Sequence, residues 1–271
     1  MLALPFALAA ALILAAPREI VIANEALDPA FADTNAAALA RRIEQVARWP
    51  KDSLRVKVFV RPREALDHIR KNKSPFAILP IHQFLEGRKA LKLDILGRAV
   101  GIEGTRPVYW GVARNEPRPY VDVETHPGLR LAFSETYDLQ WINVLFEARI
   151  RPSTHFEYLE VASATEAVTA VLDKRADLAL LHARDWNEVK MRVENKSGLA
   201  WVYESAPVPP SPVLATRWAA KADRMRLSDA LGRLCKDDGA SACGRMTVMY
   251  VEPGRADTYA GIITKYETYP R

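Results

Sequence analysis

Apolar residues along the chain follow two spacings that alternate in a regular order. Short apolar runs such as REIVIAN, LRVKVFV and PFAILP have the length and composition of β-strands. Between them, TNAAALARRIEQVARW and PREALDHIRKN repeat apolar residues at the three- and four-residue intervals of a helix. An order of strand, helix, strand, helix and strand predicts a parallel sheet with helices on its faces.

The same order begins again in the second half of the chain. LRLAF, FEYLEV and ADLALLH are predicted strands, and SETYDLQWINVLFEA and SATEAVTAVLDKR are predicted helices. The proline-rich stretch NEPRPYVDVETHPG is predicted to be a boundary or hinge, and APVPPSPVLATR a return into another strand. Two α/β units joined by extended connectors predict two lobes with a cleft between them. We expect residues 17–112 with 206–271 to form lobe 1 and residues 113–205 to form lobe 2.

The first 16 residues, MLALPFALAAALILAA, carry no charged side chain. An apolar run of about 15 residues is shorter than the roughly 20 that a transmembrane helix needs. Its length and its small terminal residues are typical of a secretory signal. We therefore expect residues 1–16 to be a signal for export to the periplasm, for which a cut after Ala15 is possible, and an uncleaved membrane anchor is the alternative.

The charge of the chain gives little support for a polyanionic partner. The net charge is +5, hydrophobic residues make up 49% and charged residues 26%, as in ordinary globular domains. Lys and Arg are scattered along the sequence, whereas nucleic-acid binding requires a clustered basic face. We expect no nucleic acid among the partners.

The two cysteines, Cys235 and Cys243, stand in the segment CKDDGASAC. They are too far apart for a CxxC redox pair and have no neighbouring His ligands for zinc. In an exported protein we expect a local disulfide, which would add about 2–3 kcal/mol of stability. Two unlinked thiols are the alternative.

Candidate ligand-binding residues follow from the position of the strands, because ligands of open α/β sheets bind beyond the carboxyl ends. Asn24 ends the first predicted strand, His82 follows PFAILP and His182 ends ADLALLH. Arg106 precedes the strand YWGVAR and could neutralise an anion. The expected ligand-binding set is Asn24, His82, Arg106, Tyr109, Ser134, Thr136, Tyr137 and His182.

The turn SETYD, residues 134–138, lies where a predicted strand enters a predicted helix. Free N–H groups at a helix start can hold an anion, and Ser134 could either contact such a ligand or cap the helix. The negative charges of Glu135 and Asp138 interact favourably with the dipole of a helix that starts at this position. If either carboxylate pointed into the cleft, however, a dianionic ligand would be repelled.

The order of these segments resembles the periplasmic solute-binding proteins of the type 2 fold, in the branch that serves phosphonate, phosphite and phosphate importers. The resemblance is carried by LRLAFSETYDLQW, VASATEAVTAVLDKRADLALLHARDW and PVPPSPVLATRW, and it spans nearly the whole mature chain. It implies a two-lobed α/β fold with an interlobe cleft, in which a Ser/Thr-rich turn of the form TSTSGY grips an oxyanion. In this chain the turn lacks the Gly and has two carboxylates, and His182 stands where the family tends to have Asp.

We therefore expect an exported receptor, not an enzyme, that closes on a small polar, anionic ligand of the phosphonate or phosphate kind. The resemblance implies delivery to an ABC permease at the membrane and a monomeric state. The sequence contains no GxSxG, HExxH or Walker motif and its five His are dispersed, so we expect no cofactor and no metal site.

Two other functions remain open. The first is a scaffold or sensor subunit that keeps the fold, has a degraded ligand pocket and binds a protein partner. The second is a small enzyme on the same fold, with Ser134 as nucleophile and His155 or His182 as base.

Overall fold

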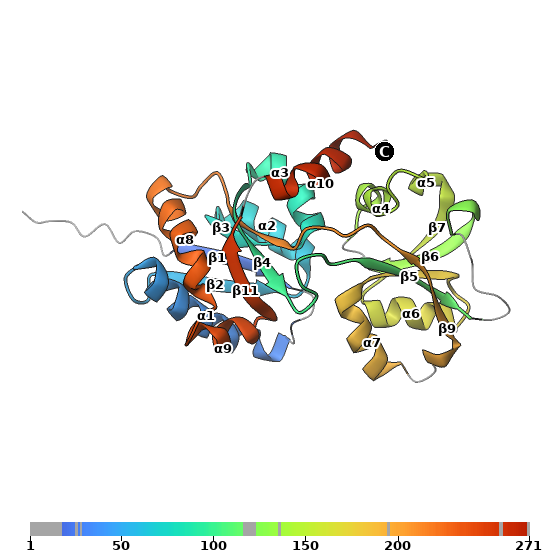
Figure 1. Ribbon diagram of the computed structural model, residues 1–271, viewed down its shortest axis with the longest axis horizontal. Helices are drawn as coiled ribbons and strands as arrows, with labels where there is room; N and C mark the ends of the chain where they lie inside the picture. Colours follow the sequence, from blue (N-terminus) through green and yellow to red (C-terminus); the bar gives the residue numbers. More distant parts are fainter. Residues whose placement is uncertain are drawn as a thin grey trace, which may run out of the picture.

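The computed structural model describes residues 18–24, 27, 29–115, 123–134, 137–193, 196–254 and 257–269. These residues form two α/β lobes that lie side by side, each built on its own sheet (Figure 1). The predicted leader, residues 1–16, lies outside the described residues. Within the described ranges, no helix has the length and apolar character needed to cross a membrane.

Lobe 1 contains a six-stranded mixed sheet in the order β11-β4-β10-β3-β1-β2. The first three strands in the chain pair in parallel, as the alternation of strands and helices predicts, whereas β10 and β11 are antiparallel to their neighbours. The strands are β1 (Arg18–Ala23), β2 (Leu54–Phe59), β3 (Phe76–Ile78), β4 (Asp94–Gly101), β10 (Ser211–Ala215) and β11 (Val248–Pro253).

Helices cover both faces of this sheet. Alternation along β1 sends Ile20 and Ile22 into one core and Val21 and Ala23 into the other. The first core is closed by α1 (Pro29–Ala47), α8 (Lys221–Leu234) and α9 (Gly239–Gly244), and the second by α2 (Pro62–Asn72) and α3 (Ile81–Leu91). A disulfide joins Cys235, directly after α8, to Cys243 in α9, with their Cα atoms 5.5 Å apart.

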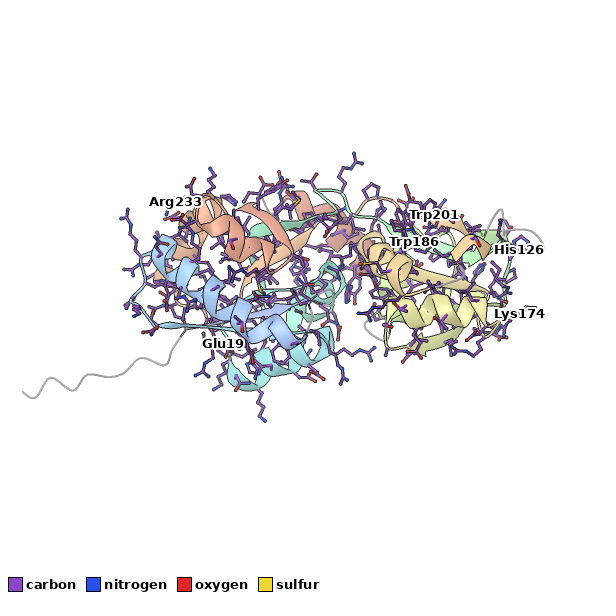
Figure 2. All side chains as sticks on the ribbon, turned by 90° about the horizontal axis from the view of Figure 1, so that it is seen from below. Glu19, His126, Lys174, Trp186, Trp201 and Arg233 are labelled. Atoms are coloured by element: carbon purple, nitrogen blue, oxygen red, sulfur yellow. A yellow bond between two sulfur atoms is a disulfide. The ribbon has the colours of Figure 1, made fainter. Side chains whose placement is uncertain are left out.

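Lobe 2 contains a five-stranded sheet in the order β7-β6-β8-β5-β9. Its strands are β5 (Tyr109–Arg114), β6 (Leu129–Ser134), β7 (Phe156–Val161), β8 (Leu178–His182) and β9 (Leu199–Glu204). Its helices are α4 (Leu139–Leu145), α5 (Pro152–His155), α6 (Ala164–Leu172) and α7 (Trp186–Arg192), with short 3-10 turns at η1 (Val123–Thr125), η2 (Ala183–Asp185) and η3 (Lys196–Gly198). At the start of α7, Trp186 packs against Trp201 of β9, with ring centroids 5.6 Å apart (Figure 2).

The chain crosses between the lobes at residues 102–108 and 205–210. The two crossing segments are joined by backbone hydrogen bonds, in which Val208 N donates to Pro107 O and Ser205 N donates to Tyr109 O, both at 2.9 Å. Because β5 pairs with β8 and β9, the predicted boundary between residues 112 and 113 falls inside a strand of the second sheet.

The proline-rich stretch predicted as a hinge does not lie at a crossing. Residues 115–128 connect β5 to β6 within lobe 2, although 116–122 lie outside the described residues. Composition alone misplaced the hinge because proline marks an extended connector and does not distinguish connectors within a lobe from those between lobes.

The last helix, α10 (Asp257–Thr268), follows the lobe 1 sheet and reaches α4 of lobe 2 (Figure 1). Gln140 of α4 donates from Nε2 to the carbonyl oxygens of Tyr266 (2.9 Å) and Tyr269 (3.0 Å). Lys265 Nζ contacts Glu147 Oε1 at 2.9 Å. These contacts add a third connection between the lobes beside the two chain crossings.

Asp177, in the segment DKRADLAL, has a structural role. Its Oδ2 accepts hydrogen bonds from the backbone N and the Nε of Arg130, both at 3.0 Å, and its Oδ1 accepts one from Arg130 Nη2 at 2.9 Å. Hydrogen bonds and charge from Arg130 lower the pKa of the Asp177 carboxyl. The residue therefore ties the start of β8 to β6 while its side chain is ionised.

We predict that Asp177→Asn lowers the free energy of unfolding at pH 7 by about 1.5–3 kcal/mol, the range for hydrogen bonds to a charged group. The folded pKa lies below the unfolded value of about 3.9, so this stabilisation is present above pH 4 and is lost as the pH falls. Urea unfolding at several pH values measures both effects. Asp173→Asn is the control, because that side chain is exposed and should change stability by about 0.5 kcal/mol or less; equal effects of the two variants would contradict the assignment.

Candidate functional site

The turn between β6 and α4 differs from the sequence-based expectation. The predicted helix was to begin at Ser134, but Ser134 is the last residue of β6 and α4 begins at Leu139. Asp138 is the helix cap, since its Oδ1 accepts a hydrogen bond from Trp141 N at 2.6 Å. The side chain of Ser134 and the whole of Glu135 and Thr136 lie outside the described residues.

Asp138 serves the structure of lobe 2 and its contact with α10. Its second carboxylate oxygen accepts a hydrogen bond from Tyr266 OH. Asp138 also lines a hollow of about 540 Å³ between α3, α4, α5 and α10, together with Glu86, Lys89 and Glu267. Burial and the Asp138 carboxylate raise the pKa of Glu86 in this hollow. The three carboxylates outnumber the one ammonium group of Lys89 in this lining, so we do not place an anionic ligand there.

Four of the predicted ligand-binding residues meet between the lobes. His82 comes from the first turn of α3, Tyr109 begins β5, Tyr137 precedes α4 and His182 ends β8. All four side chains are buried, and their rings contact edge to face, with centroids 4.9 Å apart for Tyr109 and His182, 5.6 Å for Tyr109 and Tyr137, and 5.1 Å for His82 and Tyr137. We call the hollow that they line, together with Arg184 and Glu103, the interlobe cleft.

The interlobe cleft has little free space. Its free volume is about 20 Å³, and a single water molecule needs roughly 10–15 Å³ on the same measure. The aromatic packing therefore holds the two lobes close together in this arrangement, and any larger ligand requires the side chains or the lobes to move apart.

Both histidines of the cleft are neutral. Burial, with the nearby charge of Arg184, lowers the pKa of His82 to about 3 and holds the pKa of His182 well below its usual range. The Nδ1 of His182 accepts a hydrogen bond from the backbone N of Arg184 at 3.2 Å. In the neutral ring the proton is then on Nε2, which becomes a hydrogen-bond donor.

Arg184 supplies positive charge to the cleft and was not among the predicted ligand-binding residues. It lies in η2, two positions after His182, and its Nε contacts Asp185 Oδ1 at 3.2 Å. The sequence placed His182 at a strand end, but the direction of the side chains that follow it depends on the 3-10 turn η2. Glu103, in the first crossing segment, was missed because the crossing was predicted elsewhere.

Of the remaining predicted residues, the structure describes Arg106 and Asn24, and neither lines the cleft. Arg106 is exposed and is not among the described residues that line it. Asn24 is buried in lobe 1, where its Nδ2 donates to Met246 O (3.1 Å) and Thr247 Oγ1 (2.8 Å). Thr136 and the Ser134 side chain are outside the described residues.

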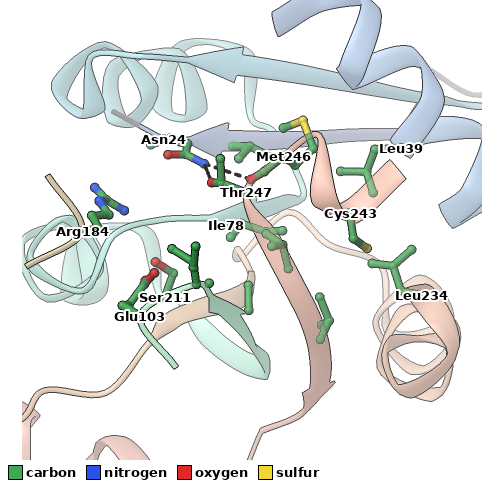
Figure 3. Close-up of a pocket in the computed structure, with 17 residues that line it drawn as sticks. Asn24, Leu39, Ile78, Glu103, Arg184, Ser211, Leu234, Cys243, Met246 and Thr247 are labelled. Atoms are coloured by element: carbon green, nitrogen blue, oxygen red, sulfur yellow. Dashed lines mark hydrogen bonds between the residues drawn. The ribbon is translucent and has the colours of Figure 1, made fainter. Parts of the chain in front are cut away.

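A second hollow adjoins the cleft and extends into lobe 1. We call it the lobe 1 cavity; its free volume is about 130 Å³. Figure 3 shows Asn24, Arg184 and Glu103 on one side of it and Leu39, Cys243 and Leu234 on the other. Glu103, Arg184 and Ser211 line both hollows, so the cavity and the cleft meet at these three residues.

The enzyme alternative gains no support from the histidines. His155 is buried in lobe 2, and its Nε2 lies 2.9 Å from the carbonyl oxygen of Val123. Among the described residues, no three His, Cys, Asp or Glu side chains are grouped so that they could hold a metal ion. His182 lies in the cleft, but its Nδ1 already accepts from the backbone of Arg184.

Comparison with known proteins agrees with this geometry. The family model for the periplasmic substrate-binding protein of phosphonate ABC transporters matches residues 29–259. No curated protein sequence shows significant similarity to the chain.

Solved structures share the two-lobed fold at low sequence identity. XAC2383 from Xanthomonas citri, bound to ATP, has a TM-score of 0.75 and 12% identity, over 94% of this chain and 100% of its own. PhnD1 from Prochlorococcus marinus, in complex with methylphosphonate, has a TM-score of 0.69 and 11% identity, over 94% of this chain and 99% of its own. A binding-protein component of an ABC phosphonate transporter from Pseudomonas aeruginosa has a TM-score of 0.69 and 12% identity, over 92% of this chain and 85% of its own. At these identities the similarity shows the fold, which is that of a type 2 periplasmic binding protein.

We predict that burial of neutral His82 makes the protein less stable in acid. The unfolded chain protonates this residue near pH 6.5, whereas the folded protein does so only near pH 3, so stability decreases as the pH falls below 6.5. The slope approaches about 1.4 kcal/mol per pH unit for one such group.

His82→Phe keeps an aromatic ring at this position and should reduce the slope of unfolding free energy between pH 6.5 and pH 4.5, measured by urea unfolding. His126→Gln is the control, because His126 is exposed and its replacement should leave the slope unchanged. An unaltered slope in His82→Phe would show that unfolding does not change the protonation of His82, which would contradict its lowered pKa.

Proposed function

We propose that this chain, which belongs to the family of periplasmic substrate-binding proteins of phosphonate ABC transporters, is an exported receptor that binds a small anion of the phosphonate or phosphate kind in the interlobe cleft. It delivers this ligand to an ABC permease at the membrane and acts as a monomer without a cofactor. Residues 1–16 are its export signal.

The observation that carries the proposal is the position of Arg184 at a cleft that both lobes line. His82 belongs to lobe 1, and Tyr137, His182 and Arg184 belong to lobe 2. Arginine binds oxyanions through charge-assisted hydrogen bonds, and the Nε2–H of His182 is a second donor at the same wall. An anion that contacts both lobes favours the closed arrangement over the open one.

Ligand entry requires the lobes to separate, because the cleft has room for about one water molecule. The two crossing segments, residues 102–108 and 205–210, are the expected hinge, since backbone rotations there move one sheet relative to the other. The contacts of α10 with α4 connect the same two lobes, and we propose that they resist opening when no ligand is bound.

We predict that Arg184→Ala weakens binding of methylphosphonate or inorganic phosphate by about 10- to 100-fold, the loss expected for a hydrogen bond to a charged group. Isothermal titration calorimetry on the mature protein measures the affinities. Arg106→Ala is the matched control, because Arg106 was the predicted counter-charge and lies outside the lining of the cleft among the described residues. Its affinity should stay within about twofold of the wild type, and a greater loss in Arg106→Ala than in Arg184→Ala would place the anion elsewhere.

A scaffold or sensor subunit on the same fold is the second candidate. The small free volume of the cleft and the carboxylate of Glu103 at its edge favour this alternative. A thermal-shift screen of phosphate, phosphonates, sulfonates, amino acids and cations separates the two, because a ligand of the folded state raises the melting temperature. A receptor responds to a ligand class, whereas a scaffold responds to none.

A further inference from the structure

The lobe 1 cavity is lined largely by side chains of the lobe 1 core. Leu39 of α1, Leu234 of α8, Val251 of β11 and Met246 line it, and each of these side chains is buried. Protein cores are close-packed, with few voids larger than a water molecule. A free volume of about 130 Å³ is similar to that of an apolar cavity of about 150 Å³ known to bind benzene.

The cavity opens where an anion would be held. Glu103, Arg184 and Ser211 are shared with the interlobe cleft, so a molecule with its charged group at Arg184 can extend into the apolar space. Ile102, next to Glu103 in the first crossing segment, also lines the cavity and is 73% exposed. The path from cleft to cavity is therefore polar at its start and aliphatic beyond it.

The wall of the cavity includes a strained residue, Thr247, that the buried side chain of Asn24 holds in place. Thr247 has φ of 58°, a left-handed conformation that is unfavourable for a β-branched residue. Asn24 stabilises it by donating from Nδ2 to Thr247 Oγ1 (2.8 Å) and Met246 O (3.1 Å), as the dashed lines in Figure 3 show. Of the nine described non-glycine residues with positive φ, Thr247 is the one that lines the cavity.

From these three features we infer that the lobe 1 cavity binds the apolar substituent of the ligand. This rests on the proposed function and names the class of ligand: an organic anion with an alkyl or aryl group of about four to six carbon atoms, comparable with benzene in size. The anionic group lies at Arg184 and the apolar group between the sheet and α1, α8 and α9.

Glu103 lines the junction of cleft and cavity together with Arg184, so its carboxylate acts on the charged group of the ligand. Gly101 makes room for its carboxylate, because a Cβ at Gly101 would come within 2.4 Å of Glu103 Oε2. A negative side chain beside Arg184 disfavours anions of higher charge. Glu103→Gln should therefore raise the affinity for every member of a phosphonate series by a similar factor and leave the preference for longer chains unchanged.

The test is a titration series with methyl-, butyl-, hexyl- and octylphosphonate, with hexan-1-ol as an uncharged probe of the cavity, measured by calorimetry on the mature protein. Burial of each additional methylene should raise the affinity about fourfold. The increase should stop near six carbon atoms, where the cavity is filled.

Val248→Phe places a ring at the cavity, and Val56→Phe is its matched control. Both valines are partly buried and pack against the same core, but only Val248 lines the cavity. In Val248→Phe the ratio of hexyl- to methylphosphonate affinity should fall toward one, whereas Val56→Phe should keep the wild-type ratio. Melting temperatures show whether each variant is folded, and the wild-type series tests the inference even if Val248→Phe is not.

The outcomes distinguish this inference from the proposed function. If methylphosphonate binds and longer chains bind no tighter, the inference is overturned and the receptor function stands. If hexan-1-ol binds and no phosphonate does, the cavity binds apolar groups, but the proposal of an anionic ligand is overturned. If no probe binds, both are overturned.

Discussion

The pairing of the two crossing segments is the interaction on which the rest of the structure depends. Val208 N donates to Pro107 O, Ser205 N donates to Tyr109 O, and Ser205 Oγ accepts from Tyr109 N at 3.0 Å. This short ladder fixes the place where the lobe 1 sheet ends and the lobe 2 sheet begins. It also positions Tyr109, whose ring contacts both Tyr137 and His182. The geometry of the cleft is thus a consequence of how the chain crosses between lobes.

The packing of the cleft also determines its electrostatics. Aromatic rings from both lobes exclude water, and this burial is the main reason that His82 and His182 stay uncharged. The positive charge of the cleft is then supplied by Arg184, which further disfavours protonation of either histidine. The Asp138 carboxylate caps α4 and accepts a hydrogen bond from Tyr266 OH. Asp138 is not among the described residues that line the cleft, so it does not offset the positive charge of Arg184 there.

The sequence predicted the fold better than the site, for physical reasons. The spacing of apolar residues is set by burial on one face or both, so strands such as LRVKVF and helices such as PREALDHIRKN could be located. The start of α4 could not be located, because Ser and Asp are almost equally good caps and the turn contains both Ser134 and Asp138. Asn24, His82 and His182 all lie near strand ends, yet only the two histidines face the cleft. That difference depends on the loop at Met246, which is more than 200 residues from Asn24 in the chain.

The lobe 1 cavity and the disulfide beside it are best considered together. The apolar side chains that line this space make fewer packing contacts than they would in a filled core, which costs stability. Cys243 lines the space and is bonded to Cys235, and closing so short a loop stabilises the fold by about 2–3 kcal/mol in the chain-entropy model. The disulfide joins the end of α8 to α9, so it fixes the spacing of two elements that line the cavity.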